Sequence, residues 1–327
     1  MRQLPFLVAL WVRRVIGTAA YNHLLSETAT GAALRVRELE RELARARRRL
    51  ARIRSHVRAA PSILFVSIPK SGTVFTREML ARGVGLEVAS LATGSFPRYA
   101  INLQALERFR HGGMVAAEHC DASPENLQLL GAFLERWVVH VRDPRSVLLS
   151  WVHHLNRLYA EQDSAPHELL YVCPTPPDEY FGYPFRQQID WNIDHFLPNV
   201  LGWTRAWIEA HDSGRYNMLL TTFSDVLAGE DAFIAKILAF YGIPPALFHK
   251  PYLEKSIRAS HFRVGRADEW RECFTASQLA RTTRMIGDDL LLRFGWPGHE
   301  GDGRGGPRRS SGPGFGAVHV AVGEAAI

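Results

Sequence analysis

The chain has 327 residues, 46% hydrophobic and 22% charged, which suits one large α/β domain with extensions or two smaller domains. Its three cysteines are widely spaced and form no CxxC or Cys/His pattern, which excludes a disulfide framework and a zinc site and favours a reducing cytoplasm. The formal net charge of +6 is uneven. Residues 1–60 hold 13 Arg and 4 Glu, a charge of +9, so the other 267 residues sum to −3.

Residues 1–60 are predicted to form a basic helical arm separate from the rest of the chain. Apolar residues recur in it at alternating spacings of three and four: Val36, Leu39, Leu43, Ala46, Leu50, Ile53 and Val57. This heptad pattern favours either self-association or a partner helix, or one amphipathic helix that packs on its own domain. The basic face suits anionic lipid or an acidic partner, or it is only a solvated surface, and no nucleic-acid partner is predicted.

The first apolar run, residues 5–12, is too short to span a bilayer, which takes about 20 residues. Arg13 and Arg14 follow it directly, where a secretory signal would move towards small residues. We therefore expect no cleaved signal. Peripheral membrane contact through this aromatic and basic patch fits better, and the expected location is cytoplasmic.

Over about the next 240 residues, sequence signals for strands alternate with signals for helices. Short apolar runs predict strands at residues 63–68, 114–117, 137–141 and 216–221, and helices are predicted at 74–82, from 124, from 144 and after 224. A capping box of Thr275 and Gln278 predicts one last helix running towards Phe294. This order predicts an α/β three-layer sandwich with a central parallel sheet.

Two stretches lack such periodicity. Residues 160–185 are rich in Pro and aromatic residues and are predicted to form a substrate loop. Residues 298–327 are Gly-rich with little apolar content and are predicted to be a disordered tail. The catalytic domain is therefore expected to span residues 61–297.

The segment after the first predicted strand reads Pro69-Lys70-Ser71-Gly72-Thr73 and leads into a helix. Backbone N–H groups at such a helix start face an anion, and the helix dipole favours negative charge there. Gly72 lets the backbone approach closely, and Lys70 adds a mobile positive charge. A Walker A loop has its Lys after the glycines, whereas Lys70 precedes the only Gly here, so this is another kind of phosphate loop.

This loop closely resembles the 5'-phosphosulfate loop of sulfotransferases that use PAPS (3'-phosphoadenosine 5'-phosphosulfate). A second segment, residues 141–150, resembles the same family because Arg142 ends a predicted strand and Ser150 follows eight residues later. At this position Arg142 can fork onto a phosphate.

A third segment, residues 262–270, resembles the family's C-terminal element. Arg263, Gly265 and Trp270 keep their relative positions, whereas Val264 stands where the family usually has Lys. The resemblance covers roughly residues 61–296 and implies the P-loop-like fold and PAPS as the donor, with no metal.

The resemblance also implies residue roles. It assigns the donor's 5'-phosphosulfate to Lys70, Ser71, Gly72 and Thr73, of which Lys70 neutralises the leaving oxygen. Phe75 is expected to pack on the adenine, and Val74 is counted among the donor-binding residues. It assigns the 3'-phosphate to Arg142, Ser150 and Arg263, next to Gly265. Phe223 stands near the family's Tyr-Glu-Asp element but lacks its hydroxyl.

The general base is expected at His119 or Glu118. His119 follows the strand at 114–117 and lies close to the place of the family's catalytic His, and a neutral imidazole suits proton abstraction near pH 7. Glu118 is the rival because some carbohydrate-acting relatives use a carboxylate. Alternation along a strand sends the two side chains to opposite faces, so only one of them is expected to reach the acceptor.

The predicted activity is sulfuryl transfer from PAPS to an acceptor hydroxyl or amine of a small molecule or saccharide. Two alternatives stay open: a nucleotide-dependent kinase or phosphotransferase with an unusual phosphate loop, and a non-enzymatic assembly protein that acts through residues 1–60. The acceptor is not determined, since an aromatic-rich stretch at 151–207 suits both sugar stacking and core packing.

Overall fold

The structure of the chain is a computed structural model that describes residues 60–161, 173–253 and 268–298. The predictions for the N-terminal arm and for the C-terminal tail lie outside these residues, apart from Ala60 and Gly298. None of the helices in the described part of the chain combines the length and the hydropathy that a membrane span requires.

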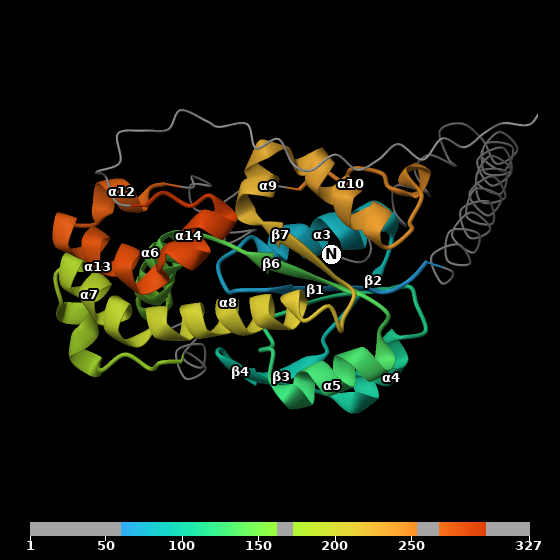
Figure 1. The fold of residues 1–327 in the computed structure, drawn as a ribbon, viewed down its shortest axis with the longest axis horizontal. Helices are drawn as coiled ribbons and strands as arrows, with labels where there is room; N and C mark the ends of the chain where they lie inside the picture. Colours follow the sequence, from blue (N-terminus) through green and yellow to red (C-terminus); the bar gives the residue numbers. More distant parts are fainter. Residues whose placement is uncertain (1–59, 162–172, 254–267, 299–327) are drawn as a thin grey trace, which may run out of the picture.

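The core of the fold is a five-stranded parallel sheet (Figure 1), with the strand order β2-β5-β1-β6-β7. Its strands are β1 Ile63–Ser67, β2 Glu87–Ala89, β5 Met114–Glu118, β6 Trp137–Val141 and β7 Met218–Thr222. The two central strands β1 and β6 are buried along their whole length. Continuous apolar runs of this kind form parallel strands because both faces of the sheet are covered by helices. The predicted fold class is confirmed.

Alternation along β1 divides the core into two parts, one on each face of the sheet. Ile63 and Phe65 face α3 and α10, whereas Leu64 and Val66 face the larger cluster that includes α5, α6 and α8. The helices of the first face are α3 Thr73–Val84, α9 Phe223–Ala228 and α10 Glu230–Phe240. Those of the second include α4 Leu103–Phe109, α5 Pro124–Phe133, α6 Pro144–Ala160, α7 Phe185–His195 and α8 Leu197–Asp212, and the C-terminal helices add to the same cluster.

Several elements have no counterpart among the predicted ones, including helices α4, α7 and α8. The short strand β2 forms one edge of the sheet, and a separate hairpin of β3 Ala92–Ser95 and β4 Arg98–Ile101 follows it. Two short 3₁₀ helices, Asp178–Gly182 and Pro245–Leu247, lie in connections. The first of them belongs to the predicted substrate loop, but Tyr180 within it is fully buried, so this part of the loop is core.

The end of the chain differs from the prediction of a single last helix. Helix α12 Trp270–Cys273 is followed by α13 Ala276–Ile286, which has the predicted capping box, and then by α14 Asp288–Phe294. Gly287 separates the last two helices with φ of 82° and ψ of 154°, a non-helical conformation that glycine adopts at low cost. Asp288 and Asp289 then begin a new helix, where negative charge is favoured.

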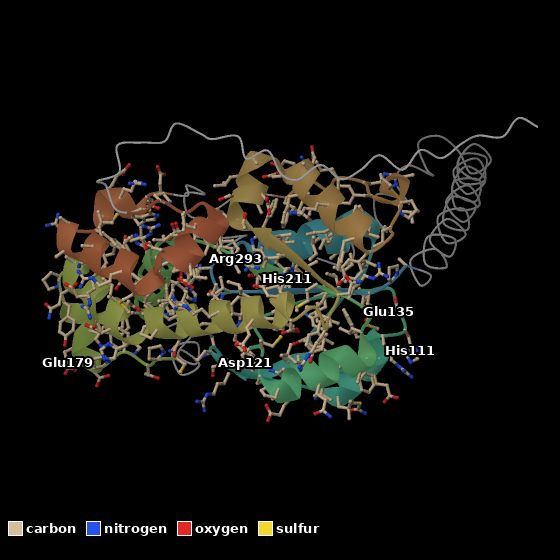
Figure 2. All side chains as sticks on the ribbon, viewed as in Figure 1. His111, Asp121, Glu135, Glu179, His211 and Arg293 are labelled. Carbon is tan, nitrogen blue, oxygen red and sulfur yellow. The ribbon has the colours of Figure 1, made fainter. Side chains whose placement is uncertain are left out.

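The C-terminal helices are tied to α8 by a surface cluster. Arg293 on α14 makes two hydrogen bonds of 2.6 and 2.7 Å to the carboxylate of Asp212, and His211 approaches the same carboxylate at 2.9 Å (Figure 2). Hydrogen bonds from Arg293 and His211 lower the pKa of Asp212 to about 2. Such exposed pairs orient an element more than they stabilise it.

Candidate active site

The predicted phosphate loop lies at the carboxyl end of β1, in the middle of the sheet. The helix that follows β1 covers one face, whereas those that follow β5 and β6 cover the other. In open parallel sheets, ligands bind at the point where consecutive helices pack on opposite faces of the sheet. The loops that carry Lys70, His119 and Arg142 therefore meet at one edge of the sheet.

The loop has an irregular backbone with two residues of positive φ. Lys70 has a φ of 66°, the only positive φ of a non-glycine residue in the described part of the chain, and Gly72 has a φ of 85°. A left-handed residue next to a right-handed one turns successive N–H groups towards a common point, which forms an anion-binding nest. A positive φ strains the backbone of a residue such as Lys70, and this strain persists where surrounding contacts hold the residue in place.

Two side chains from β6 and its following turn hold the carbonyl groups of this loop. The Nη1 of Arg142 donates to the Lys70 carbonyl at 2.6 Å, and the Nε2 of His140 lies 3.2 Å from the Ser71 carbonyl. Both carbonyl oxygens, which would repel an anion, are thus engaged by protein donors. Within the described residues, the N–H groups of Ser71 and Gly72 have no hydrogen-bond partner.

One side-chain hydroxyl of the loop has a hydrogen-bond partner, and another has none among the described residues. The Oγ atoms of Ser67 and Thr73 are 2.8 Å apart, which joins the end of β1 to the first residue of α3. The Ser71 side chain is fully buried, and its Oγ has no hydrogen-bond partner among the described residues. Buried hydroxyls in folded proteins normally have a partner, so an orphaned one in a loop of this type fits a ligand oxygen.

Phe223 closes the loop from the side of β7. Its ring lies 4.1 Å from the Arg142 guanidinium, and a Cβ added at Gly72 would be 3.4 Å from the same ring. A capping box of Thr222 and Asp225 fixes the start of α9, so Phe223 enters the site as the first residue of that helix. The structure therefore brings together Gly72, Arg142 and Phe223, three of the predicted site residues.

His119 directly follows β5 and points back to β1. Its Nδ1 lies 2.7 Å from the Ser67 carbonyl. Because a carbonyl only accepts, Nδ1 carries the hydrogen, and Nε2 of the neutral ring keeps its lone pair. Burial lowers the pKa of His119 below 6.5, and the positive charge of Lys70 lowers it further. The imidazole is thus poised as a neutral base, with Tyr99 of the hairpin at a ring distance of 6.2 Å.

Glu118 has a different environment. Its carboxylate accepts a hydrogen bond from the backbone N–H of Leu91, just before the β3–β4 hairpin, and the side chain is buried. Burial raises the pKa of Glu118, which backbone hydrogen bonds from Leu91 and Ala92 partly offset. The two candidate bases thus have separate partners, the hairpin segment for Glu118 and β1 for His119.

The other predicted site residues are less closely tied to this cluster. Val74 and Phe75 lie on the first turn of α3, and Phe75 packs against the core of the α3 face. Ser150 is half-buried on α6, about 9 Å along the helix axis from Pro144. Arg263 and Gly265 lie outside the described residues.

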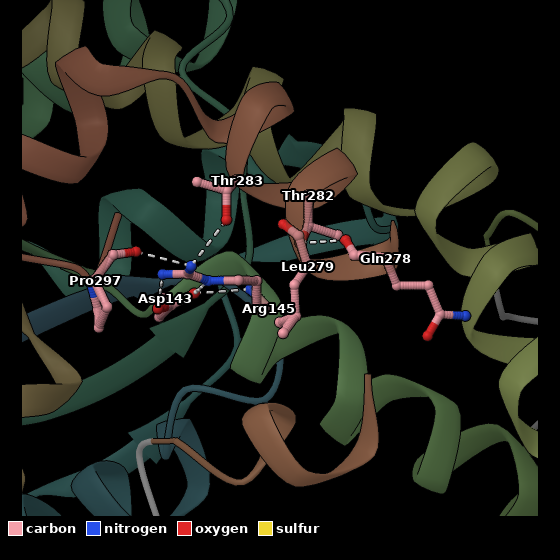
Figure 3. A network of polar contacts seen from close by, with 7 residues as sticks. All are labelled: Asp143, Arg145, Gln278, Leu279, Thr282, Thr283 and Pro297. Atoms are coloured by element: carbon pink, nitrogen blue, oxygen red, sulfur yellow. Dashed lines mark hydrogen bonds and ion pairs between the residues drawn. The ribbon is translucent and has the colours of Figure 1, made fainter. Parts of the chain in front are cut away.

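The turn after β6 contains a buried ion pair that the sequence motif did not reveal (Figure 3). Arg145, 1% exposed, donates from Nε and Nη2 to the two oxygens of Asp143 at 3.0 and 2.7 Å. Its Nη1 donates to the Pro297 carbonyl at 2.9 Å. The ring of Trp270 lies 3.9 Å from the guanidinium. This pair joins the turn that carries Arg142 to the C-terminal helices.

Two further site-adjacent residues, His140 and Ser67, were also missing from the sequence prediction. The signal for His140 was present in the strand Trp137-Val138-Val139-His140-Val141, where a polar residue occupies a fully buried position. No local pattern distinguishes such a residue from ordinary core packing. No group of three His, Cys, Asp or Glu residues suited to a metal ion occurs in the described segments.

The fold and the site define a parallel α/β protein with a loop at the carboxyl edge of its sheet whose donors lack partners among the described residues, and with a neutral histidine beside it. No protein-family model matches the sequence, and no curated protein matches it. Solved structures that resemble it include mouse sulfotransferase SULT7A1 complexed with PAP, at 16% identity and a TM-score of 0.47, over 72% of this chain and 89% of that one.

A second similar structure is retinol dehydratase in a complex with retinol and PAP. It has 16% identity and a TM-score of 0.43, over 70% of this chain and 81% of that one. Likenesses at this level are too low to transfer residue roles or substrates from those proteins to this chain.

Proposed function

We propose that the protein is a PAPS-dependent sulfotransferase that transfers a sulfuryl group to an acceptor hydroxyl or amine. The observation that carries the proposal is the loop at residues 69–73. Its sequence resembles a phosphosulfate loop, and in the fold the N–H groups of Ser71 and Gly72 and the Ser71 hydroxyl have no partner among the described residues. A phosphosulfate supplies the oxygen acceptors that these donors lack.

The residues at the site have separate roles in the proposed reaction. PAPS, when bound, supplies the activated sulfuryl group, and a new S–O or S–N bond to the acceptor forms as the bond to the bridging oxygen breaks. Lys70 is placed in the loop to neutralise the negative charge that develops on that oxygen. The Nε2 of His119 takes the proton from the acceptor, since Nδ1 is already bonded to the Ser67 carbonyl.

The 3'-phosphate is assigned to Arg142 and Ser150, together with Arg263. Arg142 is held between the Lys70 carbonyl and the Phe223 ring, so its guanidinium is fixed at the carboxyl edge of the sheet. A fixed guanidinium binds a phosphate more strongly than a mobile one because less side-chain entropy is lost. This arrangement supports selection for nucleotides that carry a 3'-phosphate.

The acceptor is placed next to His119, beside the β3–β4 hairpin. Tyr99 presents a half-buried ring there, and Asn126 fixes the hairpin by hydrogen bonds to the backbone of Tyr99 and Ile101. An aromatic ring at this position suits stacking on a sugar or a phenol. A screen of saccharide, phenol and alcohol acceptors with labelled PAPS identifies the class.

The test of the proposed function is a comparison of nucleotides by calorimetry. We expect PAP, the product of PAPS, to bind at least tenfold more tightly than ADP or AMP, because only PAP has the 3'-phosphate that Arg142 would bind. Tighter binding of ATP with Mg²⁺ than of PAP would favour a phosphotransferase. Absence of PAP binding by the purified full chain would refute the proposal.

Lys70→Ala is expected to lower kcat for sulfuryl transfer about 10²- to 10³-fold, the usual cost of removing one group that stabilises charge in the transition state. Initial rates with radiolabelled PAPS measure the effect. Lys250→Ala is a matched control because Lys250 pairs with Asp231, and the preceding residue, His249, bonds to the Gly83 carbonyl near the other end of α3. Equal rates for the Lys70→Ala and Lys250→Ala proteins would contradict the role given to Lys70.

A further inference from the structure

His140 is a buried histidine that lies directly beneath the phosphate loop and has no role in the chemistry proposed above. It is on β6 and fully buried, with the rings of Phe65 and Phe233 at 5.1 and 5.5 Å. Burial lowers its pKa to about 3, so the ring is neutral at physiological pH. A polar group in such surroundings is costly unless both of its nitrogens have partners.

The two partners of His140 determine its tautomer. Nε2 is 3.2 Å from the Ser71 carbonyl, which can only accept, so Nε2 carries the hydrogen. Nδ1 is then an acceptor, and the hydroxyl of Thr221 on β7 donates to it across 2.9 Å rather than to the Val139 carbonyl, which is 3.4 Å away. The imidazole therefore joins the loop after β1 to β7 through one chain of two hydrogen bonds.

The bond to Ser71 also orients a donor for the ligand. The Ser71 carbonyl and the Gly72 N–H belong to one peptide unit, which is planar and trans, so the two groups point in opposite directions. When His140 holds the carbonyl on the inner side, the Gly72 N–H is directed away from the sheet. Arg142 acts in the same way on the preceding unit, where it holds the Lys70 carbonyl and so directs the Ser71 N–H.

We propose that His140 is a positioning residue of the anion site: its Nε2–H fixes the Ser71–Gly72 peptide so that the Gly72 N–H faces the bound anion. The inference rests on the proposed function in taking that anion to be the 5'-phosphosulfate of PAPS. Without this bond the peptide unit can rotate and turn its carbonyl towards the anion. The left-handed conformation of Gly72 leaves that rotation sterically open.

Three substitutions separate this role from simple packing. His140→Phe keeps the size and removes both hydrogen bonds, and His140→Asn places an amide only at the level of Nδ1, within reach of Thr221. His140→Gln places an amide N–H at the level of Nε2, within reach of Ser71. We expect the Phe and Asn proteins to bind PAP about ten- to a hundredfold more weakly than the unchanged protein, because an N–H···anion bond is lost.

The Gln protein is expected to bind PAP within about threefold of the unchanged protein, as its amide restores the bond to Ser71. His111→Phe is the matched control, because His111 is an exposed histidine near the amino end of β5, away from the phosphate loop. Thermal melting shows that each variant is folded. Affinities that follow thermal stability, with no recovery in the Gln protein, or an unchanged affinity in the Phe protein, would overturn the inference.

A measurement without nucleotide tests the same point independently. Nitrogen-15 spectra of the histidine-labelled full chain should show His140 as the Nε2–H tautomer, unchanged between pH 5 and 8. An Nδ1–H tautomer would overturn the inference about His140 whatever the protein binds. Failure of the unchanged protein to bind PAP would instead refute the proposed function, so the two failures are distinguishable.

Discussion

Replacing His119 with alanine is expected to lower kcat for sulfuryl transfer by about 10²- to 10⁴-fold, the usual contribution of a positioned general base. Binding of PAP is expected to stay within about threefold of the unchanged protein, because the proposed role of His119 is towards the acceptor and its Nδ1 is bonded to the Ser67 carbonyl. Rapid-quench kinetics with labelled PAPS and calorimetry with PAP measure the two quantities. The pattern expected is a large loss in turnover with little change in nucleotide affinity.

Glu118→Gln is the matched comparison for His119→Ala. Gln keeps one oxygen that can accept from the Leu91 N–H, so this contact with the hairpin segment survives while the negative charge and the second acceptor oxygen are lost. We expect this variant to retain turnover within about tenfold. Loss of turnover in Glu118→Gln together with activity in His119→Ala would assign the base to Glu118 and contradict the proposed mechanism.

The dependence of kcat/KM on pH gives a further check on His119. Burial lowers the pKa of His119, so its ring is still neutral and able to accept a proton somewhat below pH 6.5. The acidic fall in kcat/KM should therefore have an apparent pKa below 6.5, and this limb should be lost in the residual activity of His119→Ala. A fall centred above pH 6.5 would contradict the assignment.

Arg145→Ala is expected to reduce the free energy of unfolding by about 3–5 kcal/mol, because Asp143 is left as a buried charge without its partner. The change also removes the contacts of the guanidinium with the Pro297 carbonyl and the Trp270 ring. Urea unfolding at pH 7 measures the loss. Arg82→Ala, which breaks an exposed pair with Glu78 on α3, should cost no more than about 0.5 kcal/mol.

A double substitution tests whether the unpaired charge is the cause. Asp143→Asn together with Arg145→Met removes both charges, while Asn can still accept from the Arg145 backbone position at the start of α6. The double variant should be more stable than Arg145→Ala alone. A loss below about 1 kcal/mol in Arg145→Ala would show that the pair contributes little to the fold.

The strands of the sheet were predictable from short segments of sequence. Residues 137–141 and 63–67 are mostly apolar and rich in β-branched residues, a composition typical of parallel strands that are buried on both faces. The start of α5 was also predictable from neighbouring residues, since Ser123 caps the helix and Pro124 occupies its first turn. The edge strand β2 has only three residues and is mostly exposed, so it lacks that signal.

The second half of the chain shows where local signals fail. The capping box at Thr275 predicted the start of α13 correctly, but a Gly within a helical pattern does not by itself show a break. The interruption at Gly287 depends on its backbone conformation. Strand β7 begins at Met218 and not at Tyr216, whose ring lies 5.5 Å from that of Trp137.

The sequence by itself determined the parallel α/β class, the positions of the two loops and the candidate residues Lys70, His119 and Arg142. Only the tertiary structure decided which groups of these loops face one another: His140 with Ser71, Arg142 with Lys70 and His119 with Ser67. The physical reason is that strand and cap signals arise between residues a few positions apart. These contacts join groups 52 to 72 positions apart, and they form only when β5, β1 and β6 pair in register.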